Sequence, residues 1–129
     1  MKVAERVLEK IQDTITRRLK NAVAVKKAVI GKRIDVLGYV GRFVSAKISG
    51  IKEVIGKMRI AVISPVGETA AGQALNLNAD DVASGLAVVF KARKLVFFTD
   101  VKGVLDGNGK TIPVIRIADI KNLIGKKVI

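Results

Sequence analysis

Two groups of polar residues flank one predicted helix and one predicted strand in the second half of the chain. Asn76, Asn78 and Asp80 come directly before an apolar helical run. Asp100, Lys102 and Gly103 follow the apolar segment 94–99. Loops at the carboxyl ends of buried strands are where open α/β sheets bind ligands. These residue types favour the positioning of a charged substrate, which is the main requirement of phosphoryl transfer.

The first group alternates along a segment predicted to be extended, so its three side chains should point the same way. The two carboxamides can donate hydrogen bonds to a carboxylate or acyl oxygen of a small substrate. Asp80 can orient ammonium groups that contact phosphates. The alternative is a turn followed by a helix cap, which Asn and Asp also favour. The spacing alone leaves both interpretations open.

The second group has a similar pair of interpretations. The backbone amides that follow Asp100 can meet a nucleotide, while the carboxylate accepts hydrogen bonds from a ribose or a base. The alternative is an ordinary turn, in which Asp caps and Gly103 takes a positive φ. The sequence contains neither a P-loop nor a GxGxxG motif, so these two phosphate-binding loops are not predicted.

Together the two groups resemble the amino acid kinase family. The chain reads NLNAD at 76–80, then a helical run and an apolar segment, then TDVKGVLD at 99–106. This order is similar to that of acetylglutamate kinases and of the archaeal kinases that act on carrier-protein-bound aminoadipate or glutamate. The stretches LGYVG at 37–41 and VISPVG at 62–67 also match, in the same order. The resemblance is strongest over residues 37–124.

The resemblance implies a fold and an activity. The fold is a three-layer α/β/α sandwich with a mainly parallel sheet. The activity is phosphorylation, by ATP with Mg²⁺, of the side-chain carboxylate of an N-acylated acidic amino acid in arginine or lysine biosynthesis. In this comparison Asn76 and Asn78 bind the substrate, and Asp80 is catalytic because it organises lysines. The implied nucleotide-binding residues are Asp100, Val101, Lys102, Gly103, Val104 and Leu105, and no protein metal ligand is implied.

Several elements of the family are missing from this sequence. Family members have a strand ending in Lys-Gly-Gly, a Gly-rich substrate loop with an arginine, and a later Gly-Gly-Met-x-x-Lys element. None of these occurs in the 129 residues, and Gly125-Lys126-Lys127 is a poor substitute. The two lysines that would neutralise the transferring phosphoryl group are therefore absent. We expect a kinase fold truncated at both ends and inactive as an isolated chain.

Composition narrows the chemistry further. The chain has no Cys and no His, which excludes disulfides, thiolate metal sites and histidine bases. Its net charge is +13, and residues 1–60 hold 15 Lys and Arg against 5 Asp and Glu. Such a basic half attracts phosphates, nucleic acid or an acidic carrier protein, or it is simply a solvated surface. An aromatic content of 4% argues against stacking on nucleic-acid bases.

The pattern of apolar residues predicts the elements that position these groups. Three- and four-residue spacing predicts a helix over 2–20, and further helices are expected at 49–57, 79–92 and 118–124. Strands are expected at 22–30, 42–48, 59–64 and 94–99, with a short edge strand at 111–115. The pair 59–64 and 94–99 predicts a right-handed strand–helix–strand crossover. The loop 65–74 is expected to form a lid or a hairpin tip, and 106–109 a tight turn.

The length predicts one domain over residues 1–129. No signal peptide or membrane span is predicted, so the expected location is cytoplasmic. Two alternatives to a kinase stay open. One is a basic binding module for nucleic acid or an acidic carrier protein. The other is a subunit of a homo-oligomer that assembles through the N-terminal helix.

Overall fold

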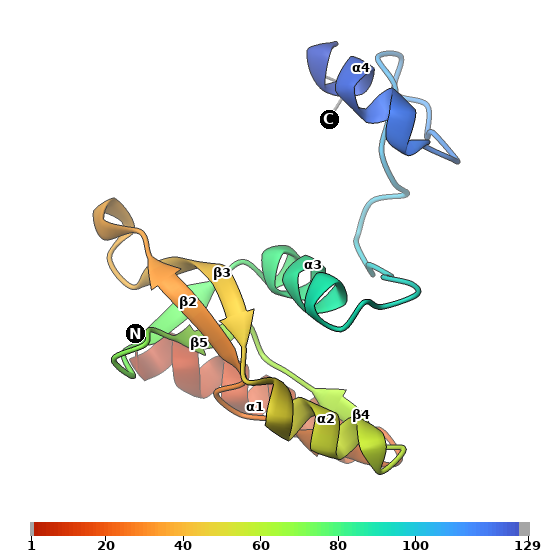
Figure 1. The fold of residues 1–129 in the computed structure, drawn as a ribbon. Coiled ribbons are helices and arrows are strands. Elements are labelled where there is room, and N and C mark those ends of the chain that lie inside the picture. The colour runs from red at the N-terminus through yellow and green to blue at the C-terminus, as the bar shows by residue number, and fades with distance from the viewer. Residues whose placement is uncertain (1, 127–129) are drawn as a thin grey trace. The chain divides into compact units, whose positions relative to one another are not determined.

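The computed structural model describes residues 2–126 of the chain, which divides into two compact units (Figure 1). The first unit is Met1–Leu95 and the second is Val96–Ile129. The prediction that residues 1–129 form a single domain stays a prediction.

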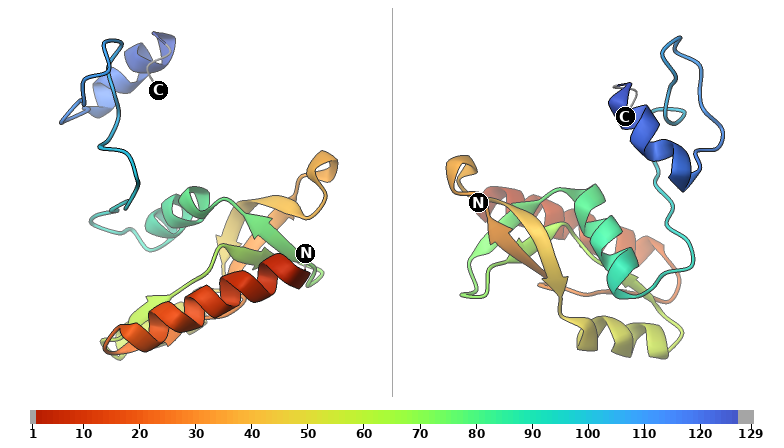
Figure 2. Two further views of the ribbon diagram at one scale, coloured as in Figure 1. Left: turned by 180° about the vertical axis from the view of Figure 1, so that it is seen from behind. Right: turned by 45° about the horizontal axis from the view of Figure 1, so that its top comes forward.

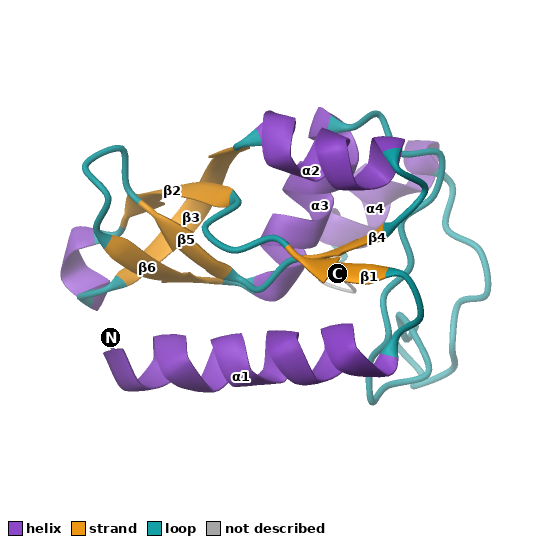
Figure 3. Cartoon of the chain, turned by 90° about the horizontal axis from the view of Figure 1, so that it is seen from below, coloured by secondary structure: helices purple, strands orange, loops and turns teal. Residues whose placement is uncertain are grey.

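The first unit contains two separate sheets, which Figure 3 shows as orange arrows. Four strands close into a small barrel in the order β2-β3-β6-β5, with two parallel and two antiparallel pairings. Two further strands, β1 and β4, form a parallel pair. The bounds are β1 Ala22–Ala24, β2 Val29–Arg33, β3 Val40–Ala46, β4 Ile60–Val62, β5 Val66–Glu68 and β6 Ala74–Leu77. The prediction of an α/β fold is confirmed at the level of class, but the described residues form a small closed barrel of mixed pairing and a two-stranded sheet instead of a mainly parallel sandwich.

The helices lie close to their predicted positions because their apolar periodicity is strong. The predicted helices 2–20, 49–57 and 79–92 appear as α1 (Lys2–Arg18), α2 (Ile48–Gly56) and α3 (Ala79–Val89). In the second unit, the prediction at 118–124 corresponds to the short helix η2 (Ile117–Asp119) and α4 (Ile120–Gly125). A further short helix, η1 (Asp35–Leu37), connects β2 to β3. No helix among the described residues is long and apolar enough to cross a membrane.

The barrel closes around two leucines of β6. Leu75 and Leu77 are buried, and three glycines from three other strands face them. A Cβ atom added to Gly31 or Gly67 would lie within 2.9 Å of the Leu77 side chain, and one at Gly41 within 2.8 Å of Leu75 Cδ1. Glycine on these strands therefore allows a four-stranded barrel to fit around leucine side chains. Gly41 and Gly67 are motif glycines of the sequence, and this packing explains them structurally.

Helix α1 is held to the β1–β4 pair by a buried side chain. Gln12 is only 2% exposed, and its Nε2 donates to the backbone oxygens of Val62 (2.7 Å) and Val25 (3.4 Å). The helix, which is red in Figure 2, contacts β1, β4 and β6. Much of its apolar face remains exposed, including Val3 at 78% and Ile11 at 49%. Although the sequence of α1 is strongly amphipathic, its apolar face is therefore only partly buried in this unit.

The predicted strand 22–30 is wrong in its extent. The segment divides into β1 and β2, and Lys27 between them has a φ of 51°. A positive φ breaks an extended chain and is uncommon for lysine, so composition did not reveal it. β2 also continues through Gly31 instead of ending there. The glycine stretch at 37–41 does bend the chain, with Gly38 at a φ of 67°, but β3 begins two residues earlier than predicted.

The predicted strand 94–99 is also wrong, and with it the strand–helix–strand crossover over 59–99. The segment has no regular secondary structure, and Phe98 is 98% exposed. A strand needs a hydrogen-bonded neighbour, which apolar composition cannot supply by itself. Among the described residues, β4 pairs with β1 alone. The predicted edge strand 111–115 is reduced to one antiparallel bridge between Leu105 and Thr111.

Two turn predictions are confirmed. Residues 65–74 become a β5–β6 hairpin with Gly67 opposite Leu75. In the second unit, Asp106 Oδ1 accepts hydrogen bonds from the backbone N–H groups of Asn108 and Lys110, both at 2.9 Å. This Asx-type arrangement satisfies the amides of the tight turn at 106–109.

Candidate functional site

The NLNAD stretch crosses the junction between β6 and α3. Leu75 and Leu77 point into the barrel, so Asn76 between them points outward by strand alternation. Asn78 is the N-cap of α3, and its Oδ1 accepts from the backbone N–H groups of Asp80 (2.9 Å) and Asp81 (3.0 Å). Asn78 can therefore cap the helix and contact a ligand at the same time. Its oxygen caps the helix, while its amide nitrogen remains available to a ligand.

Asp80 is not part of the extended segment. It is the second residue of α3, so the prediction that three side chains alternate along one strand is wrong for its last member. The cap turns the chain into the helix immediately after Asn78. Asp80 and Asp81 lie in the first turn, where acidic residues interact favourably with the helix dipole. Asp80 is exposed, and no ion pair to it is found among the described residues.

A cleft of about 540 Å³ lies between β3 and the first turns of α3. Asn78 contributes to it, which places one predicted substrate-binding residue at a concave surface. Its other lining residues are Ile34, Val40, Gly41, Arg42, Phe43, Asp81 and Ser84. The cleft thus combines an apolar wall from Ile34 and β3 with a few polar groups, as ligand sites commonly do.

Asn76 is next to this cleft in the sheet. It is the register partner of Val40 on the parallel strand β3, and its backbone N–H donates to the Tyr39 oxygen at 2.8 Å. The motif LGYVG and the motif NLNAD, separated by 34 residues in sequence, are therefore hydrogen-bonded neighbours. The sequence analysis placed both motifs in one family pattern but did not predict this pairing.

Three further lining residues, Arg42, Asp81 and Ser84, were not predicted from the sequence. The available signal was strand alternation. Val40 and Arg42 are two residues apart on β3, so both lie on the outer face of the barrel, where Val40 is the register partner of Asn76. The two α3 residues follow from helix spacing, since Asn78, Asp81 and Ser84 are three residues apart.

The predicted nucleotide-binding residues are in the second unit. Asp100 to Leu105 form an exposed, irregular segment that leads into the 106–109 turn. Thr99 Oγ1 accepts from the Val101 N–H at 3.3 Å, and the Ile112 N–H donates to the Val104 oxygen at 2.8 Å. Gly103 has a φ of 134°, which agrees with the turn predicted there. Their role in nucleotide binding stays a prediction.

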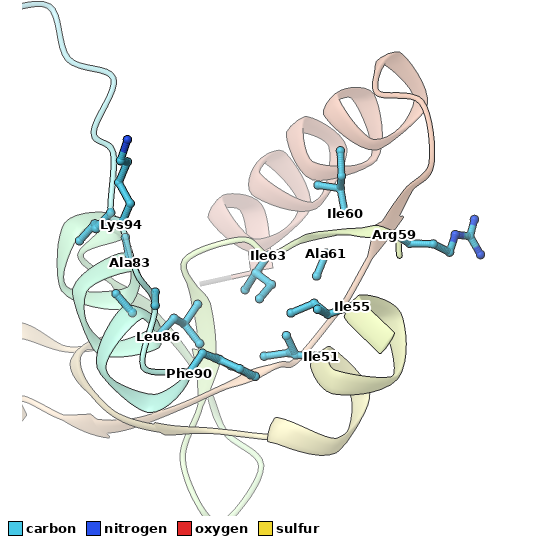
Figure 4. Close-up of a pocket in the computed structure, with 13 residues that line it drawn as sticks. Ile51, Ile55, Arg59, Ile60, Ala61, Ile63, Ala83, Leu86, Phe90 and Lys94 are labelled. Atoms are coloured by element: carbon cyan, nitrogen blue, oxygen red, sulfur yellow. The ribbon is translucent and has the colours of Figure 1, made fainter. Parts of the chain in front are cut away.

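A second cleft in the first unit, of about 420 Å³, is mainly apolar (Figure 4). Side chains from α2, β4, α3 and the residues that directly follow β4 and α3 converge on it, among them Ile51, Ile63, Leu86 and Phe90. Arg59 and Lys94 are its charged lining residues. None of the predicted site residues contributes to it, and its side chains offer packing surface more than chemistry.

The electrostatic features of the described residues are modest. The pKa of the Glu53 carboxyl on α2 is lowered, chiefly by the hydrogen bond from Lys57 Nζ at 2.8 Å and also by the charge of that ammonium group. This pair lies outside both clefts. Within residues 2–126, no group of three or more acidic side chains is arranged to hold a metal ion.

Comparison with known proteins agrees with the motif pattern. Residues 1–128 match the amino acid kinase family. The chain is 39% identical over 113 residues to an acetylglutamate kinase of Endomicrobium trichonymphae, covering 84% of this chain and 45% of that protein. It is 38% identical over 107 residues to an acetylglutamate kinase of Acidiphilium cryptum, covering 83% of this chain and 36% of that protein.

A solved structure is also similar. The crystal structure of smu.665 from Streptococcus mutans matches with a TM-score of 0.78 and 28% identity. The match covers 94% of this chain and 51% of that one. The chain therefore spans about half, or less, of the length of the relatives that it matches.

Proposed function

The chain belongs to the amino acid kinase family, and from this premise we propose that it carries the acyl-amino-acid part of an acetylglutamate kinase-type site. The reaction of such a site transfers the γ-phosphoryl group of ATP to the side-chain carboxylate of an N-acylated acidic amino acid. The substrate is either the free acylated amino acid or one linked to an acidic carrier protein. Asn76 and Asn78 are proposed to bind it, and Asp80 to organise catalytic lysines.

The observation that carries the proposal is the position of Asn78. It caps α3 through its oxygen and lines the cleft between β3 and α3. Because the cap fixes the carboxamide, its NH₂ group is oriented before any ligand arrives. Such preorganisation lowers the entropy cost of binding and supports a role in holding an acyl or carboxylate oxygen.

The ATP part of the proposal involves the second unit. Asp100 is proposed to accept hydrogen bonds from the nucleotide, and the backbone amides through Leu105 to contact it. Mg²⁺ usually keeps several waters and binds through substrate phosphates with one or two carboxylates. Such an ion would be carried by the phosphates of ATP, because the described residues contain no group of three or more acidic side chains placed to hold it by themselves. When bound, it would supply charge neutralisation of the phosphates.

We expect this 129-residue chain to bind ligands without turnover. The family's two phosphate-neutralising lysines have no counterpart in its sequence, and phosphoryl transfer depends on charge neutralisation. The test is an NMR titration of ¹⁵N-labelled protein with N-acetyl-L-glutamate, combined with a hydroxamate assay for acyl phosphate. Shifts around Asn76 and Asn78 without hydroxamate are expected. No shifts at either residue would refute the substrate assignment, and robust hydroxamate formation would refute the argument from missing lysines.

A second proposed function is assembly into a homo-oligomer through α1. Apolar residues recur at every fourth position along α1 and at the residue that follows it, and their side chains are 43–78% exposed. They are Val3, Val7, Ile11, Ile15 and Leu19. A contiguous apolar stripe of this kind is typical of an interaction surface. The proposal does not exclude the kinase-type site, because the β3–α3 cleft contains no α1 residue.

A further inference from the structure

The 106–109 turn of the second unit contains an asparagine that is followed by a glycine, Asn108 and Gly109. Both residues are exposed. The other asparagines of the chain, at 21, 76, 78 and 122, are followed by alanine or leucine. Because Gly109 has no Cβ atom, its backbone nitrogen can approach the neighbouring carboxamide with little steric hindrance. The turn therefore contains the groups for a reaction between a backbone amide and a side-chain amide.

This reaction is deamidation through a cyclic imide. The backbone nitrogen of Gly109 bonds to Cγ of Asn108, and the bond between Cγ and the side-chain nitrogen breaks. The side-chain NH₂ group takes up the proton of the Gly109 N–H and leaves as ammonia. One water molecule then opens the imide at either carbonyl. The product is aspartate or isoaspartate, and its new carboxyl group is ionised at neutral pH.

The turn must open before the nitrogen of Gly109 can attack. Its N–H donates to the Asp106 backbone oxygen at 3.0 Å. The Asp106 side chain holds the same turn closed, because its Oδ1 accepts from the N–H groups of Asn108 and Lys110, both at 2.9 Å. The closed turn thus protects the asparagine, and the rate of the reaction depends on how often the turn opens.

Opening of this turn requires little free energy. Among residues 100–110, Asp106 alone is partly buried and the others are exposed. The flanking segments are joined by a single antiparallel bridge between Leu105 and Thr111 instead of a strand ladder. Segments with exposed backbone hydrogen bonds and few buried contacts open locally at a small fraction of the global unfolding free energy.

We propose that Asn108 deamidates in the folded protein, and that the product weakens the adjoining nucleotide segment, a second part that rests on the proposed function. The new carboxylate lies two residues from Asp106, whose carboxylate repels it. An isoaspartate also adds a carbon atom to the main chain of the turn. The Ile112 N–H donates to the Val104 oxygen at 2.8 Å, so a distorted turn displaces a strand that is bonded to the predicted nucleotide-binding residues.

The test incubates the full chain, folded, in mildly alkaline buffer. Peptide mass spectrometry measures the exchange of NH₂ for OH at each asparagine, and labelling by an isoaspartyl methyltransferase measures isoaspartate. In wild type, Asn108 should react before the other asparagines. Asn108→Gln should stay unmodified at this position, because its imide would need a larger ring.

A second variant tests the role of the turn. Asp106→Ala should raise the rate at Asn108 about fivefold, because the closed turn loses hydrogen bonds to a charged acceptor. Hydrogen exchange of the Gly109 amide should rise by the same factor. Asp119→Ala, which removes an exposed carboxylate elsewhere in the second unit, should change neither rate.

The outcomes separate the modification from the proposed function. Deamidation of Asn108 no faster than that of the other asparagines would overturn the proposal, and an unchanged rate in Asp106→Ala would overturn the protection by the turn. Incubated wild type should lose the rise in melting temperature with ATP and Mg²⁺ in proportion to its deamidated fraction, whereas incubated Asn108→Gln should keep it. An equal rise in fresh and incubated wild type would overturn the second part. No rise in fresh wild type would overturn the proposed nucleotide site and the second part with it, while the mass measurement still decides the first.

Discussion

Gly85 of α3 lies directly against the ring of Phe43 on β3. A Cβ atom added at Gly85 would be 2.3 Å from both Cδ1 and Cε1 of that ring. Real Cβ atoms do not approach a ring so closely, so either the ring or the helix would have to move. Because Phe43 also lines the cleft with Asn78, this contact sets the position of α3 against the barrel at the candidate site.

The first prediction is that Gly85→Ala destabilises the protein. Overpacking a filled site typically costs about 1–3 kcal/mol, of which the helix-propensity gain of alanine over glycine offsets at most about 1 kcal/mol. Urea unfolding followed by circular dichroism measures the free energy of unfolding. In a Phe43→Ala background the same change should become neutral or stabilising, and an unchanged penalty there would contradict the proposed steric cause. Gly56→Ala is a matched control, since no atom lies within 4 Å of its added Cβ.

A second prediction separates the two roles of Asn78. Asn78→Ala should lower the free energy of unfolding by about 0.5–2 kcal/mol, because the Asp80 and Asp81 N–H groups lose their cap. Asn78→Asp should keep the stability, because a carboxylate accepts the same bonds, but it should lose binding of N-acetyl-L-glutamate. Urea unfolding and NMR titration of both variants provide the measurements. Full binding by Asn78→Asp would show that the NH₂ donor is not used.

A third prediction concerns the nucleotide. ATP with Mg²⁺ should raise the melting temperature of wild type, since a ligand that binds only the folded state stabilises it. Asp100→Ala should abolish the shift by removing the proposed acceptor. Asp119→Ala, which removes an exposed carboxylate elsewhere in the second unit, should keep it. Thermal-shift titration with ATP and Mg²⁺ measures these melting temperatures. Equal shifts for wild type and Asp100→Ala would show that the proposed nucleotide site is wrong.

A fourth prediction concerns the exposed stripe of α1. Light scattering of wild type should give a mass above that of a monomer, because burial of the stripe against a second copy removes apolar surface from water. The double change Val7→Lys with Ile11→Lys should yield a monomer. The same change at Val36 and Val44, two exposed apolar residues away from α1, should leave the mass unaltered. A monomeric wild type at all concentrations would refute assembly through this helix.

Much of the secondary structure could be predicted because its signals are local. The periodicity of α1, α2 and α3 predicted each helix to within three residues at either end. The Asp-Gly-Asn-Gly sequence predicted the 106–109 turn, and a helix cap was one of the two interpretations of the Asn and Asp group that includes Asn78. Each of these depends on neighbours within a few positions along the chain. The family pattern was likewise readable, because residues 76–80 and 99–106 are contiguous motifs.

The strand errors share one physical origin. Segments 22–30 and 94–99 have the apolar composition of strands, but strand formation depends on a hydrogen-bonding partner that can be distant in sequence. In the first segment a positive φ at Lys27 divides the run, and in the second no pairing occurs within the described residues. Composition therefore identified where apolar residues gather, without identifying which of them would pair.

The sequence by itself determined the chemical groups available to this protein: no His or Cys, a strongly basic first half, and the asparagines and aspartates of a kinase-type motif. Only the tertiary structure decided which of these groups meet. The β2–β3 register places Lys32 opposite Arg42, and the β3–β6 register places Val40 opposite Asn76. Arg42 and Asn78 line the same cleft. Such register depends on non-local packing, here of Leu75 and Leu77 against the glycines of three other strands. A one-residue slip would turn Arg42 into the barrel, so the candidate site exists only when the barrel closes in this register.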